Sequence, residues 1–155
     1  GTVTGVQTCA LPIFHRTRTV VQMRRSLGDP IPEIDSAIPV RTFLPGIDDE
    51  SWLSLNNAAF AGHPEQSEWT NRDLEIRCKE SWFEPSGFFI AELDKSMAGF
   101  CWTKVHGGHS HQHSPNDPIH DHDPIGEIYI MGVSPQFRGR GVGRAVTLEI
   151  GRAHV

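Results

Sequence analysis

The spacing of apolar residues changes along the chain and predicts alternating strands and helices. Short runs of β-branched and aromatic residues between turn residues are typical of strands, whereas Trp52, Leu55 and Phe60 recur at the spacing of one helix face. Thr70 and Asp73 have the spacing of a capping box, which predicts the start of a second helix. We therefore expect strands over residues 40–44, 87–93, 97–105 and 126–133, and helices over 49–60, 70–79 and from about 141. This order is typical of an α/β (α+β) domain.

The predicted elements are joined by turns of recognisable chemistry. Asp48 and Asp49 lie where the first helix begins, and a side-chain acceptor and negative charge both stabilise a helix there. The segment from Asp94 to Ser96 turns the chain between two strands. Residues 87–105 are therefore expected to form a hairpin.

Arginine and glycine alternate between the last predicted strand and the last predicted helix. Glycine allows left-handed backbone conformations and a close approach to a ligand, while the N–H groups of a helix start and guanidinium groups both favour anions. We predict a pyrophosphate site on Arg138, Gly139, Arg140, Gly141, Val142, Gly143 and Arg144. A Walker loop is excluded because no Gly-Lys-Ser/Thr follows, and the Gly-x-Gly-x-x-Gly spacing of a dinucleotide fingerprint is absent. A ligand-free glycine-rich turn is the simpler alternative.

Composition narrows the class of protein. The chain has 155 residues and a net charge of -5, and no apolar stretch is long enough to cross a membrane. We expect one domain with its own core, no nucleic-acid or membrane partner, and a cytoplasmic location because no secretory signal is recognisable. Cys9, Cys78 and Cys101 have neither metal nor redox spacing. No basic partner is evident for Cys78 on its predicted helix, so an inert thiol is favoured over a nucleophile.

A loop rich in histidine precedes the last predicted strand. It contains His106, His109, His111, His113, His120 and His122, with Asp117, Asp121 and Asp123. Imidazole and carboxylate suit zinc or nickel, but the spacing is irregular and prolines interrupt it, whereas a metal site needs fixed geometry. We favour adventitious chelation over a physiological site and expect no required metal.

Both ends of the chain stand apart from the rest. Thr8 to Ile13 and Ile150 to Val155 can be translations of one DNA element read in opposite orientations, as in a sequencing-library adapter. We expect residues 1–13 and 150–155 not to be native and exclude them from reasoning about the fold. Residues 14–27 alternate like a strand with one basic face, and residues 28–39 are proline-rich like a linker. The two segments are interpreted as the tail strand of a preceding domain and the connection to the next.

Gln136, Gly139 and Gly141 form the pattern Gln-x-x-Gly-x-Gly, which resembles the acetyl-CoA loop of the GNAT acetyltransferases. Further runs resemble the C-terminal GNAT domain of the mycothiol synthase family: Val40 to Phe43, Asn57 to Phe60, His63 to Gln66, Gly87 to Phe89, Trp102 to His106, and Pro124 to Tyr129 leading into Gly132 and Val133. The resemblance implies a GNAT acyl-CoA N-acyltransferase fold over residues 40–149. That fold is a mixed, mostly antiparallel sheet with flanking helices, here with its C-terminal third missing. The preceding domain would be a first GNAT domain of a monomeric tandem-domain enzyme.

The same resemblance implies an activity. That family uses acetyl-CoA as cosubstrate to acetylate the cysteinyl amine of cysteinyl-glucosaminyl-inositol, by direct attack of a small-molecule primary amine on the thioester. A carboxylate can hold the ammonium group and accept its proton, and Glu127 is the expected catalytic residue. The matched positions are Glu65, Lys104 and Glu127 for the substrate, and Met131, Gly132 and Val133 for the acetyl and pantetheine parts of the cofactor, beside the pyrophosphate loop.

The missing strands and last helix usually supply the acid for the leaving thiolate, so the chain by itself is expected to be inactive. Two alternatives stay open. One is a GNAT enzyme for another small amine, and the other is a metal-binding module built on the histidine-rich loop.

Overall fold

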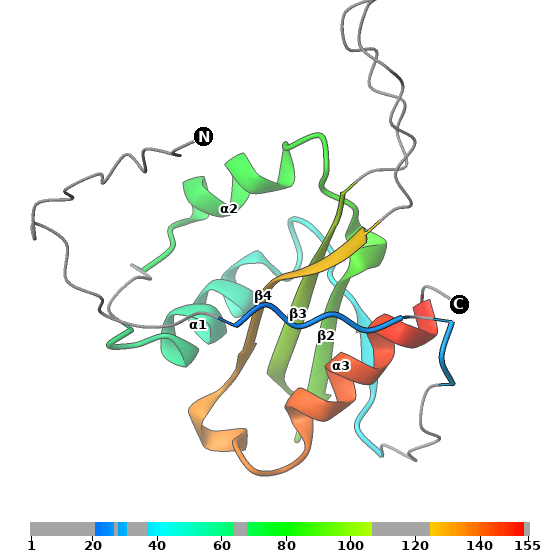
Figure 1. Cartoon of the computed structure of the whole chain (residues 1–155). Helices are drawn as coiled ribbons and strands as arrows, with labels where there is room; N and C mark the ends of the chain where they lie inside the picture. Colours follow the sequence, from blue (N-terminus) through cyan, green and yellow to red (C-terminus); the bar gives the residue numbers. More distant parts are fainter. Residues whose placement is uncertain (1–20, 27, 31–36, 64–67, 107–124, 154–155) are drawn as a thin grey trace, which may run out of the picture.

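In the described part of the chain, four strands and three α-helices follow one another in the predicted order (Figure 1). The structure is a computed structural model and describes residues 21–26, 28–30, 37–63, 68–106 and 125–153. The elements are β1 (Val40–Thr42), α1 (Asp49–Ala59), α2 (Asn71–Cys78), β2 (Phe88–Leu93), β3 (Ser96–His106), β4 (Ile125–Val133) and α3 (Val142–Ala153), with the 3-10 helices η1 (Pro85–Gly87) and η2 (Pro135–Phe137).

The strands form one antiparallel sheet in the order β1-β2-β3-β4. In the β2–β3 hairpin Leu93 pairs with Ser96, and the two residues between them, Asp94 and Lys95, have φ of 53° and 61°. Two consecutive positive φ values are typical of a type I′ turn, whose twist matches that of the strands. The predicted hairpin is confirmed. The outer edge of β4 has no strand partner among the described residues.

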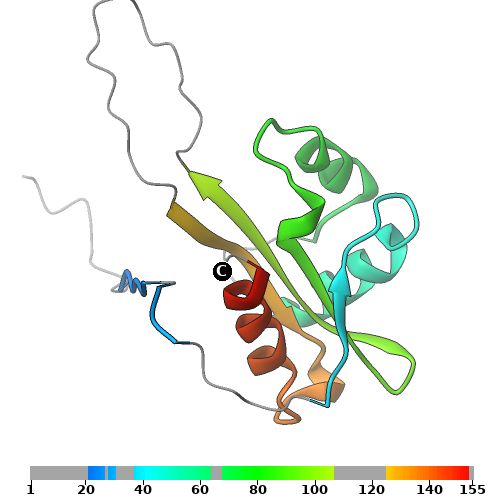
Figure 2. The same ribbon diagram turned by 90° about the vertical axis from the view of Figure 1, so that its right-hand side faces the viewer.

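Helices cover both faces of the sheet, with α1 and α2 on one face and α3 on the other (Figure 2). The α1 side is filled by aromatic rings. The ring of Trp52 lies 5.6 Å from that of Phe88, 5.3 Å from Phe100 and 5.9 Å from Trp102, and all four side chains are fully buried. The α3 side is filled mainly by smaller side chains: Ala91, Ala98, Cys101, Phe137, Val142 and Val146. The sheet therefore carries a thick aromatic layer on one face and a thin layer on the other.

The helix starts show one prediction confirmed and one corrected. At α2, Asp73 N–H donates to Thr70 Oγ1 at 3.3 Å and Thr70 N–H donates to Asp73 Oδ2 at 2.8 Å, so the capping box is formed. At α1, Asp48 is the N-cap residue but makes no side-chain cap bond. Its buried carboxylate instead accepts bonds from Arg41, at 2.6 and 2.9 Å, and from Leu44 N–H at 2.8 Å. The Asp48 carboxylate therefore pairs with the Arg41 guanidinium group and does not cap the helix.

The structure describes only part of the two ends of the chain. Residues 21–26 are exposed and have no regular secondary structure here, and the strand expected over 14–27 as part of a preceding domain stays a prediction. A strand needs a hydrogen-bonded neighbour, and no strand of the described sheet pairs with this segment. Residues 1–13 lie outside the described residues. At the other end α3 continues to Ala153, and Ile150 packs against the α3-side core. No described helix has the length and apolar character needed to cross a membrane.

Candidate active site

The arginine-glycine loop lies between β4 and α3 and has the backbone conformation expected of it (Figure 1). Gly139 and Gly141 have φ of 77° and 85°, which L side chains rarely adopt. No heavy atom lies within 4 Å of a Cβ placed at Gly139, so backbone conformation and not lack of space requires glycine there. The predicted left-handed glycines are confirmed at these two positions.

The start of α3 presents backbone donors next to this loop. Ala145 N–H donates to the carbonyl of Gly141 at 3.0 Å, so the amides of Val142, Gly143 and Arg144 precede the first intrahelical bond. Together with the helix dipole, such donors favour an anion. Val142 itself is buried against β3, which fixes the first turn to the sheet.

The three arginines of the loop differ in their contacts. Arg138 Nη2 donates to the carbonyl of Ala59, the last residue of α1, at 3.1 Å. Arg140 Nη1 lies 2.8 Å from Asp94 Oδ2, and its guanidinium carbon lies 5.4 Å from the centroid of the Phe137 ring. For Arg144 there is no hydrogen bond or ion pair to another described residue. Two guanidinium groups are thus held by the protein, and the third extends from the first turn of α3.

The free edge of β4 offers backbone groups beside the loop. Ser134 N–H donates to Ala98 O at 2.9 Å, which makes this a hydrogen-bonded pair of the β3–β4 ladder. Because hydrogen-bonded and non-hydrogen-bonded pairs alternate in an antiparallel ladder, the N–H of Gly132 points toward β3, and those of Met131 and Val133 point outward. The family resemblance implied that all three residues contact the cofactor. The geometry favours Met131 and Val133 as the outward backbone donors.

Glu127 and Lys104 lie opposite each other in the β3–β4 ladder, near the end of the hairpin. Glu127 Oε2 lies 2.5 Å from Nε2 of His106, and both side chains are about half exposed. Lys104 Nζ lies 4.8 Å from the centroid of the Trp82 ring. The structure thus brings two of the three predicted substrate residues together. The third, Glu65, lies outside the described residues.

Aromatic rings form the floor beneath this pair. Tyr129, two positions after Glu127 on β4, has its ring 5.0 Å from that of Trp82 and 5.5 Å from that of Trp102. Such rings give a rigid apolar surface with one polar tip. His106 was expected only as part of the histidine-rich loop, and Trp82 and Tyr129 were not expected as site residues. Alternation along a strand is a signal that could have placed His106 on the same face as Lys104.

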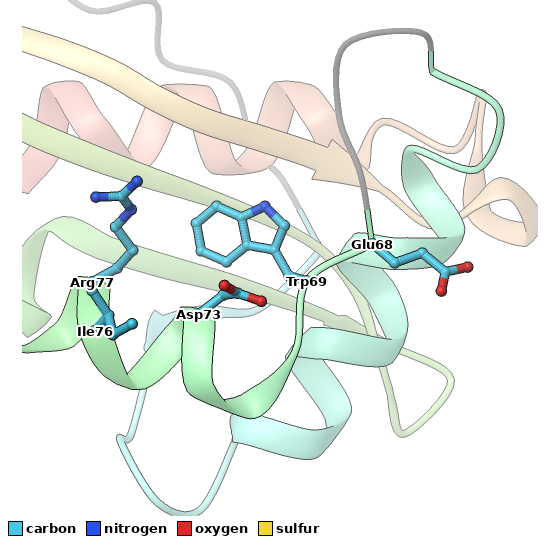
Figure 3. Close-up of a pocket in the computed structure, with 5 residues that line it drawn as sticks. All are labelled: Glu68, Trp69, Asp73, Ile76 and Arg77. Atoms are coloured by element: carbon cyan, nitrogen blue, oxygen red, sulfur yellow. The ribbon is translucent and has the colours of Figure 1, made fainter.

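A shallow hollow of about 310 Å³ adjoins this floor on the α2 side (Figure 3). It is lined by Glu68, Trp69, Asp73, Ile76 and Arg77. Figure 3 shows the ring of Trp69 and the guanidinium group of Arg77 on the same side of α2, with Glu68 pointing away from them. Asn57 holds the backbone of Trp69 through two 2.9 Å hydrogen bonds, and the Trp69 ring lies 6.4 Å from that of Trp102. The hollow and the Glu127 region therefore share an aromatic wall.

The cysteine thiols and a metal site are the other chemistry considered from the sequence. Burial raises the pKa of the Cys101 thiol to about 12, and burial together with nearby Asp49 raises that of Cys78 to about 11, so both thiols are inert at neutral pH. The expectation for Cys78 is confirmed. Among the described residues no group of three metal-ligating side chains occurs. Of the histidine-rich loop only His106 is described, so the metal-binding alternative falls outside the described residues.

A strand that ends in an Arg-Gly loop and a helix start, with outward amides on its free edge, places backbone donors where they favour an anion. Residues 50–150 match the family model of the Acetyltransferase (GNAT) family. The chain belongs to this family, and the predicted GNAT fold is confirmed.

The chain is similar to several proteins of known name. It is 50% identical over 137 residues to a mycothiol acetyltransferase of Acidothermus cellulolyticus, covering 87% of this chain and 42% of the relative. It is 49% identical over 142 residues to a mycothiol acetyltransferase of Thermobispora bispora, covering 90% and 45%. The chain thus spans less than half the length of the curated relatives it matches.

A solved structure agrees on the fold. The crystal structure of a GCN5-related N-acetyltransferase from Sphaerobacter thermophilus superposes with a TM-score of 0.56 at 21% identity, over 80% of this chain and 34% of that one. At this identity the likeness concerns the fold alone.

Proposed function

We propose that this chain is the acetyl-CoA-binding part of an N-acetyltransferase that acetylates the cysteinyl amine of cysteinyl-glucosaminyl-inositol. The observation that carries the proposal is the layout of β4. Glu127 lies near its start, the outward amides of Met131 and Val133 near its end, and the Arg-Gly loop directly after it. At about 3.3 Å per residue, Glu127 and Val133 are roughly 20 Å apart, which leaves room for an extended thioester between an acceptor amine and the loop.

The cofactor side would use the backbone more than side chains. The first-turn amides of α3 and Arg144 would bind the pyrophosphate, and the left-handed glycines let it approach the main chain. The outward N–H groups of Met131 and Val133 would bind the acyl arm, where fixed donors stabilise negative charge that develops on a carbonyl oxygen.

The acceptor side would prepare the amine. A primary amine attacks a thioester only as the free base, so its ammonium form must first lose a proton. The Glu127 carboxylate would hold the ammonium group and accept that proton, directly or through water. Lys104, placed over Trp82, would be a further substrate contact, and the aromatic floor limits access of water from below.

We further propose a cytoplasmic, monomeric enzyme with two tandem GNAT domains, of which this chain covers most of the second. The share of each relative that the chain covers supports a second region of similar size. In this arrangement the group that protonates the leaving thiolate lies outside the present chain.

The test is acetyl transfer by a full-length protein that contains this chain. With acetyl-CoA supplied, mass spectrometry should detect addition of one acetyl group to cysteinyl-glucosaminyl-inositol. Its kcat/KM should be at least tenfold higher than for glucosaminyl-inositol without cysteine or for a simple primary amine. A preference for the simple amine would show that the proposed acceptor is wrong. Transfer to none of the three amines would overturn the proposed function.

Replacing Glu127 by Gln tests its role in the same assay. Removal of a general base should lower kcat by about 100-fold or more, because base catalysis typically contributes 10²–10⁴-fold. The Kd for acetyl-CoA, measured by calorimetry, should change less than about twofold, since Glu127 lies at the far end of β4 from the loop. Unchanged turnover would remove Glu127 from the mechanism.

A further inference from the structure

His106, the last residue of β3, contacts the proposed catalytic carboxylate from the neighbouring strand. Nε2 of His106 lies 2.5 Å from Oε2 of Glu127. Glu127 is paired in the ladder with Lys104, whereas His106 is paired with Ile125. The imidazole thus reaches diagonally across the ladder to the carboxylate, while the Lys104 ammonium group lies over Trp82.

The chemistry of the two groups determines which one donates. An ionised carboxylate has only acceptor sites, so the proton of this bond belongs to Nε2 of His106. This holds for the neutral Nε2–H tautomer and for the imidazolium ion alike. Oε2 of Glu127 is therefore occupied by His106, and Oε1 has no hydrogen-bond partner in the described part of the chain.

Stability does not account for this contact. The side chains of His106 and Glu127 are 48% and 54% exposed. Exposed ion pairs contribute little to folding because water screens them and both side chains lose freedom. Around the pair, Lys104 and Tyr129 are the other titratable groups close by on these two strands, and Trp82 lies against both. The pair stands beside an aromatic floor, and within the described part of the chain Oε1 of Glu127 stays available to a ligand.

We propose that His106 is a positioning residue that holds Glu127 so that Oε1 faces the acceptor amine. A carboxylate that turns freely presents either oxygen in many directions, and proton transfer needs the acceptor within hydrogen-bond reach of the amine. Fixing Oε2 removes this freedom before the amine binds. The inference rests on the proposed function and adds a residue to its acceptor site.

A double-mutant cycle in the full-length protein tests the proposal. His106→Ala should lower kcat/KM for the acceptor by about tenfold, with the Kd for acetyl-CoA changed less than about twofold. In the Glu127→Gln background the same substitution should change kcat/KM by less than about twofold, because no carboxylate is left to position. An undiminished tenfold loss in that background would overturn the proposal.

Two further variants separate positioning from general damage to the strand. His106→Gln keeps an amide donor close to the position of Nε2 and should restore most of the activity lost in His106→Ala. Val105→Ala changes the preceding residue of β3, whose side chain points to the opposite face, and should leave kcat/KM unchanged. Failure of Gln to restore more activity than Ala would contradict the hydrogen bond as the cause.

NMR with 15N-labelled histidine detects the His106–Glu127 hydrogen bond independently of enzymatic activity. The His106 signals, assigned by their loss in His106→Gln, should show a proton on Nε2, and Glu127→Gln should shift them. An unprotonated Nε2, or signals unaffected by Glu127→Gln, would overturn the proposal even in an active enzyme. A confirmed contact in a protein that acetylates no amine would instead refute the proposed function and, with it, the catalytic use of the contact.

Discussion

Replacing Gly99 by Ala would insert a methyl group between β3 and the start of α3. The new Cβ would lie 2.5 Å from Cγ1 of Val142 and 3.1 Å from the carbonyl oxygen of Gly132. Val142 is 1% exposed, so the close-packed atoms around it leave its methyl group little room to turn aside. The carbonyl of Gly132 belongs to the backbone of β4. Either α3 or β4 must therefore shift.

The size of the effect follows from two opposing terms. Inserting a methyl group into a packed core costs about 1–3 kcal/mol. Replacing glycine by alanine also restricts the unfolded chain, which returns about 0.4–1 kcal/mol. The net destabilisation is about 1–2 kcal/mol, and at about 2–4 °C per kcal/mol for a domain of this size the Tm should fall by about 2–8 °C.

Thermal unfolding of the full-length variants measures this shift. Gly126→Ala is the matched control, because Gly126 also lies in a strand and no heavy atom lies within 4 Å of its added Cβ. Its Tm should be equal to that of the wild type or slightly higher. The Kd for acetyl-CoA should rise in Gly99→Ala, since Val142 begins the helix whose first-turn amides are proposed to bind the pyrophosphate. Equal Tm values for Gly99→Ala and the wild type would refute the close packing of α3 on β3.

Three further predictions concern local features. Thr70→Ala should destabilise the protein by about 1 kcal/mol through loss of the capping box, and an unchanged denaturant midpoint would contradict the cap. The hydrogen bond from Arg41 holds the pKa of Asp48 below its ordinary value of 3.8, so the stability it contributes is present above about pH 4 and is lost as the pH falls further. Asp48→Asn should therefore lower the Tm at pH 7 and flatten its decline in acid, and a parallel decline in both proteins would exclude Asp48 as the cause. Iodoacetamide at pH 8 should leave Cys101 unmodified in the folded protein, because burial raises the pKa of its thiol to about 12; mass spectrometry showing full alkylation before unfolding would contradict this.

Local chemistry explains which elements could be predicted from the sequence. The capping box of Thr70 and Asp73 and the β2–β3 turn at Asp94 depend on residues close together in the chain, and both formed as expected. The left-handed conformations of Gly139 and Gly141 follow from glycine at those positions. Asp48 shows the limit of such reasoning. Its carboxylate prefers the guanidinium group of Arg41 on β1 to the helix start, and that choice depends on packing.

The acceptor side could be predicted only in part because the β3–β4 register is not a local property. A short hairpin fixes its register through its turn, but residues 107–124 separate these two strands. The register also shifts at an irregularity between Trp102 and Thr103, and beyond it Lys104 lies opposite Glu127. Family resemblance supplied these two residues, whereas the contact of Glu127 with His106 depends on the register itself. No sequence pattern specified that contact.

The contacts of the loop arginines bear on how the proposed pyrophosphate site would work. Arg140 and Asp94 are 47% and 62% exposed, and a pair this accessible is worth at most about 1 kcal/mol. A dianionic pyrophosphate carries more charge than one carboxylate and can therefore draw Arg140 away from Asp94 at small cost. Arg138 differs because its partner is the carbonyl of Ala59 at the end of α1, where the helix dipole is negative. Arg138 thus ties the loop to α1, and we expect it to position the backbone amides, while Arg140 and Arg144 supply the charge.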